Sequence, residues 1–111
     1  MSSLKFLRNV ELKPEEILFV ESDINYSRIF LCSGRQIIIA KTLKQITEIV
    51  KGTSIVRVNR QVMLNACYIK YLSNSSFPQT AELMDGKTIA FSRRRTLEVQ
   101  YHLKKYSIKT F

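Results

Sequence analysis

The chain has 111 residues, 45% of them hydrophobic, and a formal net charge of +9. That length suits a single compact domain, no apolar run approaches the roughly 20 residues of a membrane span, and the first residues lack the pattern of a secretory signal. We therefore expect one soluble, cytoplasmic domain with no membrane partner.

The first part of the chain contains a lead-in and three strand-like runs. Residues 1–13 are of mixed character and are expected to form a lead-in segment, whereas residues 17–21 are β-branched and aromatic, as in a buried strand. The apolar residues 26–32 and 35–40 are joined through Gly34, which predicts a hairpin because glycine readily adopts positive φ.

Residues 42–52 have the pattern of a short amphipathic helix. Apolar side chains recur at helical spacing from Leu43 to Val50, Thr42 is an acceptable N-cap, and Gly52 suits the C-terminal cap. The sequence therefore predicts a helix directly after the first three strands.

Short strand-like runs follow the predicted helix. Residues 54–60 alternate in polarity, and residues 68–72, 81–84 and 87–92 are further candidates. Asp85-Gly86 lies between the last two and is a strong hairpin signal. The fold class is therefore predicted to be mainly β.

The C-terminal part allows two interpretations. In residues 96–106 the apolar side chains alternate, as in a strand, but apolar pairs at i, i+4 also fit a helix. Ser92 is an acceptable N-cap and favours the helix. We expect a domain over residues 14–106 with one or two short α-helices, followed by a C-terminal tail at 107–111.

The charge is unevenly distributed along the chain. Residues 1–25 carry a net −2, so residues 26–111 carry a net +11. Nucleic acid is the best partner for such a surface, because Lys and Arg side chains that bind its regularly spaced phosphates release counterions, which favours the complex. An anionic membrane fits less well, since the basic residues are spread between strands and not gathered on one amphipathic helix. A merely solvated basic surface is the plain alternative.

Catalytic and metal chemistry find little support in the sequence. His102 is the only histidine, the two cysteines lack zinc-ligand spacing, and the glycines lie at isolated turns and not in a phosphate-binding loop. Cys32 lies in an apolar run and is expected to be a small buried thiol. We predict no enzymatic activity, no cofactor and no metal.

The most informative polar segment is SIVRVNRQVMLN, residues 54–65. If its valines face the core, Arg57 and Asn59 point to the opposite face, and Arg60 and Gln61 follow where the strand ends. Side chains of these types bind guanine and adenine edges or phosphate. All four are therefore candidate DNA contacts.

A structural role is the alternative for parts of this segment. Arg57 would then pair with an acid such as Glu48 or Glu82, and Asn65 would close a turn through backbone hydrogen bonds. We favour the structural role for Asn65 and the functional role for Arg60.

Three arginines, Arg93, Arg94 and Arg95, follow the expected cap Ser92. A helix N-terminus carries partial positive charge and favours acidic residues in its first turn, so this conflict with a local rule points to a functional site. A phosphate there would be held by backbone N–H groups and by guanidinium groups together. The alternative is a solvated charge run whose side chains fan apart.

A third candidate contact lies after the first strand. Asn25 belongs to a turn, and Tyr26, Ser27 and Arg28 follow it with stackable, polar and cationic groups. Its signal is weak by itself, and charge alone does not single it out.

The series ILFVES, YSRIFLCSG, TLKQITEIV, VRVNRQVMLN and ELMDGKTIAFSRR resembles the LytTR DNA-binding domain, the output module of many bacterial response regulators. The resemblance extends from about Ile17 to Leu103. Its most specific features are the following: Arg57 and Arg60 before Asn65, then Ile69, Asp85-Gly86 and Ser92-Arg93-Arg94.

The resemblance implies an elongated stack of small antiparallel sheets with short helices. It implies binding to double-stranded promoter DNA at imperfect direct repeats, with loops inserted into successive major grooves and the duplex bent. It also allows an upstream receiver domain and a homodimer on DNA. By motif position, the family's base and phosphate contacts fall on these residues: Asn25, Ser27, Arg28, Asn59, Arg60, Gln61, Arg93 and Arg94.

The sequence departs from the family pattern at three positions around the first arginine. Ile55 stands where the family usually has an aromatic residue, Asn59 replaces its histidine, and Gln61 replaces its serine. These departures bear on the base preference and leave the fold and the phosphate contacts unchanged.

Our hypothesis from the sequence is a transcription regulator in which Arg60 and Arg94 read bases. Phosphates would be bound by Arg28, Arg57, Arg93 and Arg95. One rival is an RNA or single-strand binder that stacks bases on its aromatic side chains, Tyr26, Tyr68, Tyr71 and Phe91. The other is a protein-interaction module whose basic face meets an acidic partner.

Overall fold

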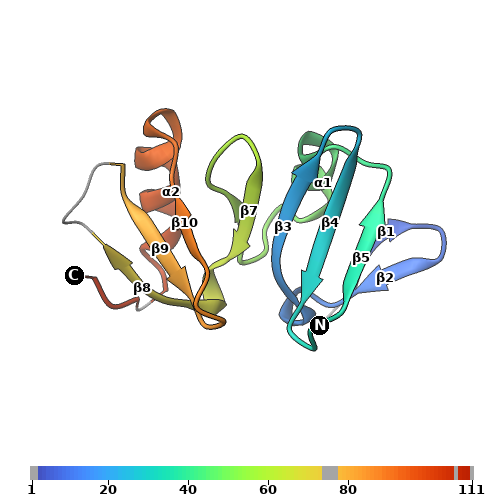
Figure 1. Ribbon diagram of the computed structural model, residues 1–111, viewed down its shortest axis with the longest axis horizontal. Helices are drawn as coiled ribbons and strands as arrows, with labels where there is room; N and C mark the ends of the chain where they lie inside the picture. Colours follow the sequence, from blue (N-terminus) through green and yellow to red (C-terminus); the bar gives the residue numbers. More distant parts are fainter. Residues whose placement is uncertain (1–2, 74–77, 107, 111) are drawn as a thin grey trace.

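A five-stranded antiparallel sheet lies at the centre of the computed structural model, which describes residues 3–73, 78–106 and 108–110 (Figure 1). Its strands, in spatial order, are β5 (Gln36–Ile39), β4 (Tyr26–Leu31), β3 (Ile17–Asp23), β7 (Val62–Asn65) and β6 (Ile55–Arg57). Neighbouring side chains of β3 are buried on opposite faces, with Val20 in one core cluster and Phe19 in the other. The sheet is therefore covered on both sides, as the period of 2 along a strand requires.

One face of the sheet is covered by α1 (Leu43–Ile49) and by a two-stranded sheet of β1 (Leu4–Leu7) and β2 (Val10–Leu12). The helix begins as predicted: Thr42 Oγ1 accepts a hydrogen bond from Gln45 N at 3.2 Å, and Gln45 Oε1 accepts one from Thr42 N at 2.9 Å. This reciprocal capping box satisfies two backbone donors that the helix itself leaves open.

The first residues differ from the expected lead-in. Phe6 and Leu12 are buried in the same cluster as α1, so the segment up to residue 12 contributes to the core. After Leu12 a 3-10 turn, η1 (Pro14–Glu16), leads into β3. The strand pairing of β1 with β2 shifts register between Lys5 and Leu7. This irregularity breaks the alternation by which a strand is recognised in sequence.

The other face of the central sheet is covered by a three-stranded antiparallel sheet and by α2 (Thr96–Leu103). The strands are β10 (Thr88–Ala90), β9 (Thr80–Leu83) and β8 (Ile69–Ser73). One 3-10 turn, η2 (Ala66–Tyr68), leads from β7 of the central sheet into β8, and another, η3 (Arg93–Arg95), leads from β10 into α2. The layers succeed one another along the longest of the principal extents, 42 × 29 × 24 Å. The mainly β, elongated stack expected from the sequence is confirmed.

Both predicted hairpins are confirmed, with Gly34 at φ 94° and Gly86 at φ 93° in the turns. The ambiguous C-terminal segment is helical, because Val99 and Leu103 are buried together while the other apolar residues point outward. The chain then returns to β8, where Leu72 N donates to Lys109 O at 2.8 Å. Part of the expected tail is thus hydrogen-bonded to a sheet; residues 107 and 111 lie outside the described residues.

One local expectation was wrong. Cys32 is exposed, because β4 ends at Leu31 and the alternation of the strand no longer applies one residue later. In β6 the expected alternation is confirmed, because Val56 and Val58 pack in one core cluster and Ile55 lies in the cluster on the other face.

Candidate nucleic-acid interface

The loop 58–61 is held in shape by its own polar side chains. Asn59 Oδ1 accepts hydrogen bonds from Gln61 N and from Val62 N, each at 2.8 Å. Arg57 Nε donates to Asn59 O at 3.2 Å, and Arg57 Nη2 donates to Arg60 O at 2.8 Å. The loop therefore has a defined geometry although it contains no regular ladder.

The same loop is joined to the segment 92–95. Asn59 Nδ2 donates to Ala90 O at 2.7 Å, and Ser92 N donates to Val58 O at 2.9 Å. The two basic segments that the sequence singled out, more than 30 residues apart in the chain, are therefore neighbours in space. Arg60, at the tip of the loop, is exposed.

The segment 92–95 is built as predicted. Ser92 Oγ accepts a hydrogen bond from Arg95 N at 3.3 Å, and the three arginines form the 3-10 turn that leads into α2. Arg93 and Arg94 are exposed, and Arg95 is half-buried. The 3-10 turn itself contains no acidic side chain, whereas Glu98 in the first turn of α2 offsets part of the positive charge of the helix start.

The turn 23–26 between β3 and β4 extends the same edge of the molecule. Ser22 N donates to Gln61 O at 2.8 Å, which fixes the end of β3 against the loop. Arg28 Nη2 lies 3.1 Å from Asp23 Oδ2 in an ion pair, and Asn25 is exposed. We call these three segments, residues 23–26, 58–61 and 92–95, the basic edge; Figure 1 shows them following one another along one side of the molecule.

The side chains of two expected contact residues are hydrogen-bonded within the protein. Ser27 is completely buried, and its hydroxyl donates to Lys41 O at 2.6 Å, so its side chain cannot reach a bound duplex. Arg57 is turned toward the loop carbonyls and is half-buried. The alternative that Arg57 pairs with an acid is wrong as well, because Glu48 pairs with Lys51 and Glu82 with Lys70.

The structural role favoured for Asn65 is confirmed. The residue is completely buried, and its Nδ2 donates to Pro14 O at 3.0 Å and to Ile17 O at 2.8 Å. Its Oδ1 accepts from Cys67 N at 3.0 Å and from Ser54 Oγ at 2.6 Å. Asn65 thus ties the central sheet to the turns on both sides of it.

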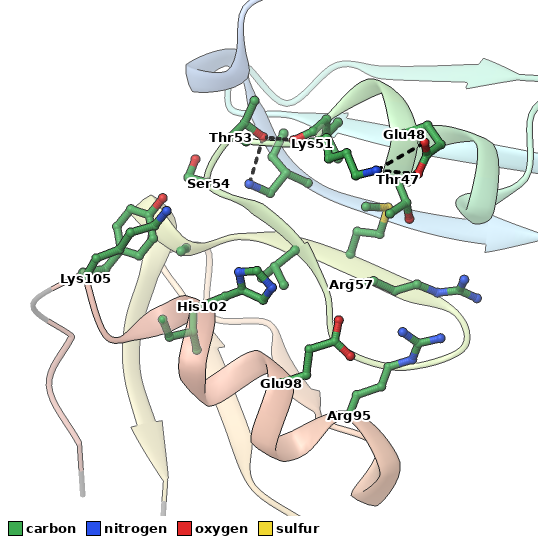
Figure 2. Close-up of a pocket in the computed structure, with 18 of the residues that line it drawn as sticks. Thr47, Glu48, Lys51, Thr53, Ser54, Arg57, Arg95, Glu98, His102 and Lys105 are labelled. Carbon is green, nitrogen blue, oxygen red and sulfur yellow. Dashed lines mark hydrogen bonds and ion pairs between the residues drawn. The ribbon is translucent and has the colours of Figure 1, made fainter.

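Like charges are concentrated where the loop meets the segment 92–95. Burial lowers the pKa of Arg57 below its ordinary value, and the nearby charges of Arg95 and Arg60 lower it further. Figure 2 shows the guanidinium groups of Arg57 and Arg95 close to one another on the same side. An anion at this position would relieve the repulsion between them.

One exposed residue of the basic edge escaped the sequence interpretation. Ile24, at the tip of the turn 23–26, is 91% exposed and has φ 54°. Such a backbone conformation is unusual for a β-branched side chain. Only the polar neighbours Ser22, Asp23 and Asn25 indicated a turn, and nothing in their chemistry marked the isoleucine.

Neither a metal-binding group nor a membrane-spanning helix is found in the described part of the chain. Within it, no group of three or more His, Cys, Asp or Glu side chains could hold a metal ion. No helix there is long and apolar enough to cross a membrane.

Comparisons with known proteins agree with this geometry. The family model LytTR, described as the LytTr DNA-binding domain, matches residues 8–104. The LytTr DNA-binding domain of a putative methyl-accepting/DNA response regulator from Bacillus cereus has a similar structure, with a TM-score of 0.76 and 12% identity over 92% of this chain and 94% of that chain. At such low identity the likeness shows the fold alone, and a comparison with curated proteins gave no match. Because the family model covers most of the sequence, the chain belongs to the LytTR family of DNA-binding domains.

Proposed function

We propose that this domain regulates transcription by binding promoter direct repeats in duplex DNA through its basic edge. The observation that carries the proposal is the pair of hydrogen bonds, Asn59 Nδ2 to Ala90 O and Ser92 N to Val58 O, that joins the two arginine-bearing segments. A single rigid surface thereby presents Arg60 beside Arg93 and Arg94. Such a surface suits a partner with regularly spaced negative charges.

The residues in the basic edge and directly beside it divide into proposed DNA contacts and residues that hold these contacts in position. Arg60 and Arg94 are exposed and are the base-reading candidates, because a guanidinium group can bind guanine O6 and N7 in a bidentate manner. Arg28, Arg93 and Arg95 neutralise phosphates, and Asn25 and Gln61 add polar contacts at the same edge. Asn59 and Arg57 act from behind by keeping Arg60 in position.

The shape of the molecule supports contacts in successive grooves. Its longest extent is 42 Å, whereas one turn of B-DNA spans roughly 34–36 Å. The basic edge is made of turns and a short 3-10 segment, so it would enter the major groove with loops and not with a long recognition helix. Reading two grooves from one face would require the duplex to bend toward the protein.

The single-strand alternative loses most of its stacking surface. Phe91 lies in the core, Tyr71 donates its hydroxyl proton to Glu82, and Tyr68 donates its own to Glu15 O. Only Tyr26, 52% exposed, lies at the basic edge among the four aromatic candidates.

The proposal is tested by selecting binding sites from random duplexes and sequencing the retained DNA. We expect an enriched motif that occurs as two copies about one helical turn apart, roughly 10–10.5 base pairs. Competition with single-stranded DNA and RNA probes should leave the duplex complex largely intact. Retention without enrichment of any sequence would reduce the function to nonspecific binding, and no duplex affinity at low salt would favour the protein-interaction alternative.

A further inference from the structure

A crevice of about 410 Å³ opens between α1 and α2, at the β6 edge of the central sheet (Figure 2). Its volume lies within the roughly 300–1,000 Å³ that small-molecule sites occupy. Its apolar lining residues include Val56, Met63 and Leu103. Polar and charged side chains from both helices also line it, among them Glu48, Glu98 and His102, as Figure 2 shows. This combination suits a ligand that has an apolar body and a charged group.

The charges around the crevice are unequal. The cationic side chains that line it are Lys44, Lys51, Arg57, Arg95 and Lys105, and the acidic ones are Glu48 and Glu98. Lys51 Nζ lies 3.4 Å from Glu48 Oε2, so these two charges offset each other. Four cations then face Glu98 alone, and the charged group of a ligand would be negative.

The backbone of β6 adds a hydrogen-bond donor on this side. Val58 N donates to Val62 O at 3.1 Å and Ser54 O accepts from Ala66 N at 2.8 Å, so the alternate residues of this strand face β7. Arg57 is one residue out of phase with Ser54 and Val58, so its backbone N–H does not face β7. Because β6 is the edge strand, the Arg57 N–H is directed away from the sheet, toward the edge where the crevice lies.

We propose that this crevice binds a small amphipathic carboxylate. The carboxylate would accept hydrogen bonds from the backbone N–H of Arg57 and from the Arg95 guanidinium. Its negative charge would reduce the repulsion between the guanidinium groups of Arg57 and Arg95. The apolar body would contact the apolar lining residues Val56 and Leu103. The Arg57 guanidinium can keep its hydrogen bonds to the loop carbonyls throughout.

Occupation of the crevice has a consequence for DNA, and this second step rests on the proposed function. Arg95 belongs both to the crevice and to the basic edge. A bound carboxylate would neutralise charge that a phosphate otherwise uses, so ligand and DNA weaken each other's binding by the same factor. The crevice would then act as a site for an inhibitory organic acid.

The binding step is tested without DNA, by titrating the ¹⁵N-labelled chain with 2-naphthoate and with the uncharged 2-naphthalenemethanol. We expect saturable amide shifts confined to residues 44–57, 63–66 and 95–106, and about tenfold weaker binding of the alcohol. Equal affinity for the two probes, or shifts scattered over the surface, would overturn the proposal.

Two substitutions with opposite expected effects on 2-naphthoate affinity distinguish the loss of a ligand contact from the loss of folding. Arg95→Gln should weaken 2-naphthoate binding about tenfold, whereas Glu98→Gln should strengthen it about threefold because it removes the opposing charge. Arg35→Gln, in the β4–β5 turn, is the matched control and should change nothing. Failure of Glu98→Gln to strengthen binding would contradict the charge argument.

The coupling to DNA is measured afterwards, by repeating a duplex titration with and without saturating 2-naphthoate. We expect weaker duplex binding by the native chain and no change for the Arg95→Gln variant. If 2-naphthoate binds the crevice while the duplex affinity is unaltered, the result supports the binding site and contradicts its inhibitory role. Absence of duplex binding in either titration would instead count against the proposed function.

Discussion

The loop 58–61 and the segment 92–95 carry similar side chains and use them differently. In and beside the loop, Arg57 and Asn59 are hydrogen-bonded to the loop's own backbone. In the segment 92–95, the cap is made by Ser92 alone, and Arg93 and Arg94 extend outward. Polar residues thus stabilise the backbone of the first region, whereas those of the second form the proposed contact surface, together with the exposed Arg60 of the loop.

The largest effect is expected from removing the outward-facing arginine of each region together. Arg60→Ala with Arg94→Ala should cost about 2–6 kcal/mol in binding to a selected duplex, since each base contact contributes about 1–3 kcal/mol. Because both side chains are exposed, the free energy of unfolding should change by less than about 0.5 kcal/mol. Titrations of a fluorescent duplex and urea denaturation measure the two quantities.

The matched control for this pair is Arg8→Ala with Arg35→Ala, two exposed arginines outside the basic edge. It removes the same charge and should cost far less in binding. Equal losses for the two double variants would mean that only net charge matters. Equal losses on selected and random duplexes would remove the base-reading role of Arg60 and Arg94.

The loop 58–61 should lose its defined conformation when the Asn59 side chain is truncated. Asn59→Ala removes the acceptor of two backbone N–H groups and the donor to Ala90 O, and should cost about 2 kcal/mol of unfolding free energy. Asn59→Asp keeps the two accepted bonds and loses only the donor, so a smaller loss is expected. Thermal or urea unfolding separates them, and an equally stable Asn59→Ala variant would show that the loop does not depend on this side chain.

Much of the fold followed from local patterns in the sequence. Gly34 and Gly86 marked hairpins whose turns need positive φ, and Thr42 with the apolar period after it marked α1. The first hairpin escaped detection because a register shift near Phe6 interrupts the period of 2. Cys32 was misplaced for a related reason, since its strand ends one residue earlier.

The candidate interface was harder to predict from sequence, because the orientation of its side chains depends on the tertiary path of the chain. The residue types of Arg57, Asn59 and Ser27 suit DNA contacts, and the spacing of the motif does not reveal which side chains turn inward. Arg57 reaches the carbonyls of the loop only because the chain leaves β6 directly after it. Ser27 is buried by the packing of β4 beside β5, which is not encoded by its neighbours in sequence.

A smaller effect should distinguish support from contact at Arg57. Arg57→Lys retains the charge but cannot donate to two carbonyls with the same geometry, so it should cost about 1 kcal/mol of unfolding free energy. Because Arg57 acts from behind the loop, the slope of log affinity against log salt concentration should stay the same for Arg57→Gln. A decrease of that slope by about 1 would restore Arg57 as a phosphate contact.

The smallest change is expected at Arg93, where a phosphate contact should be lost without any loss of sequence preference. If about four phosphates are neutralised, log affinity of the native domain should fall with log salt at a slope near −3.6, and Arg93→Ala should lower the magnitude by about 0.9. The weakening should be uniform across duplex sequences, because a phosphate contact fixes the register of the protein and reads no base. An unchanged salt slope together with a relaxed sequence preference would place Arg93, and not Arg94, among the residues that read bases.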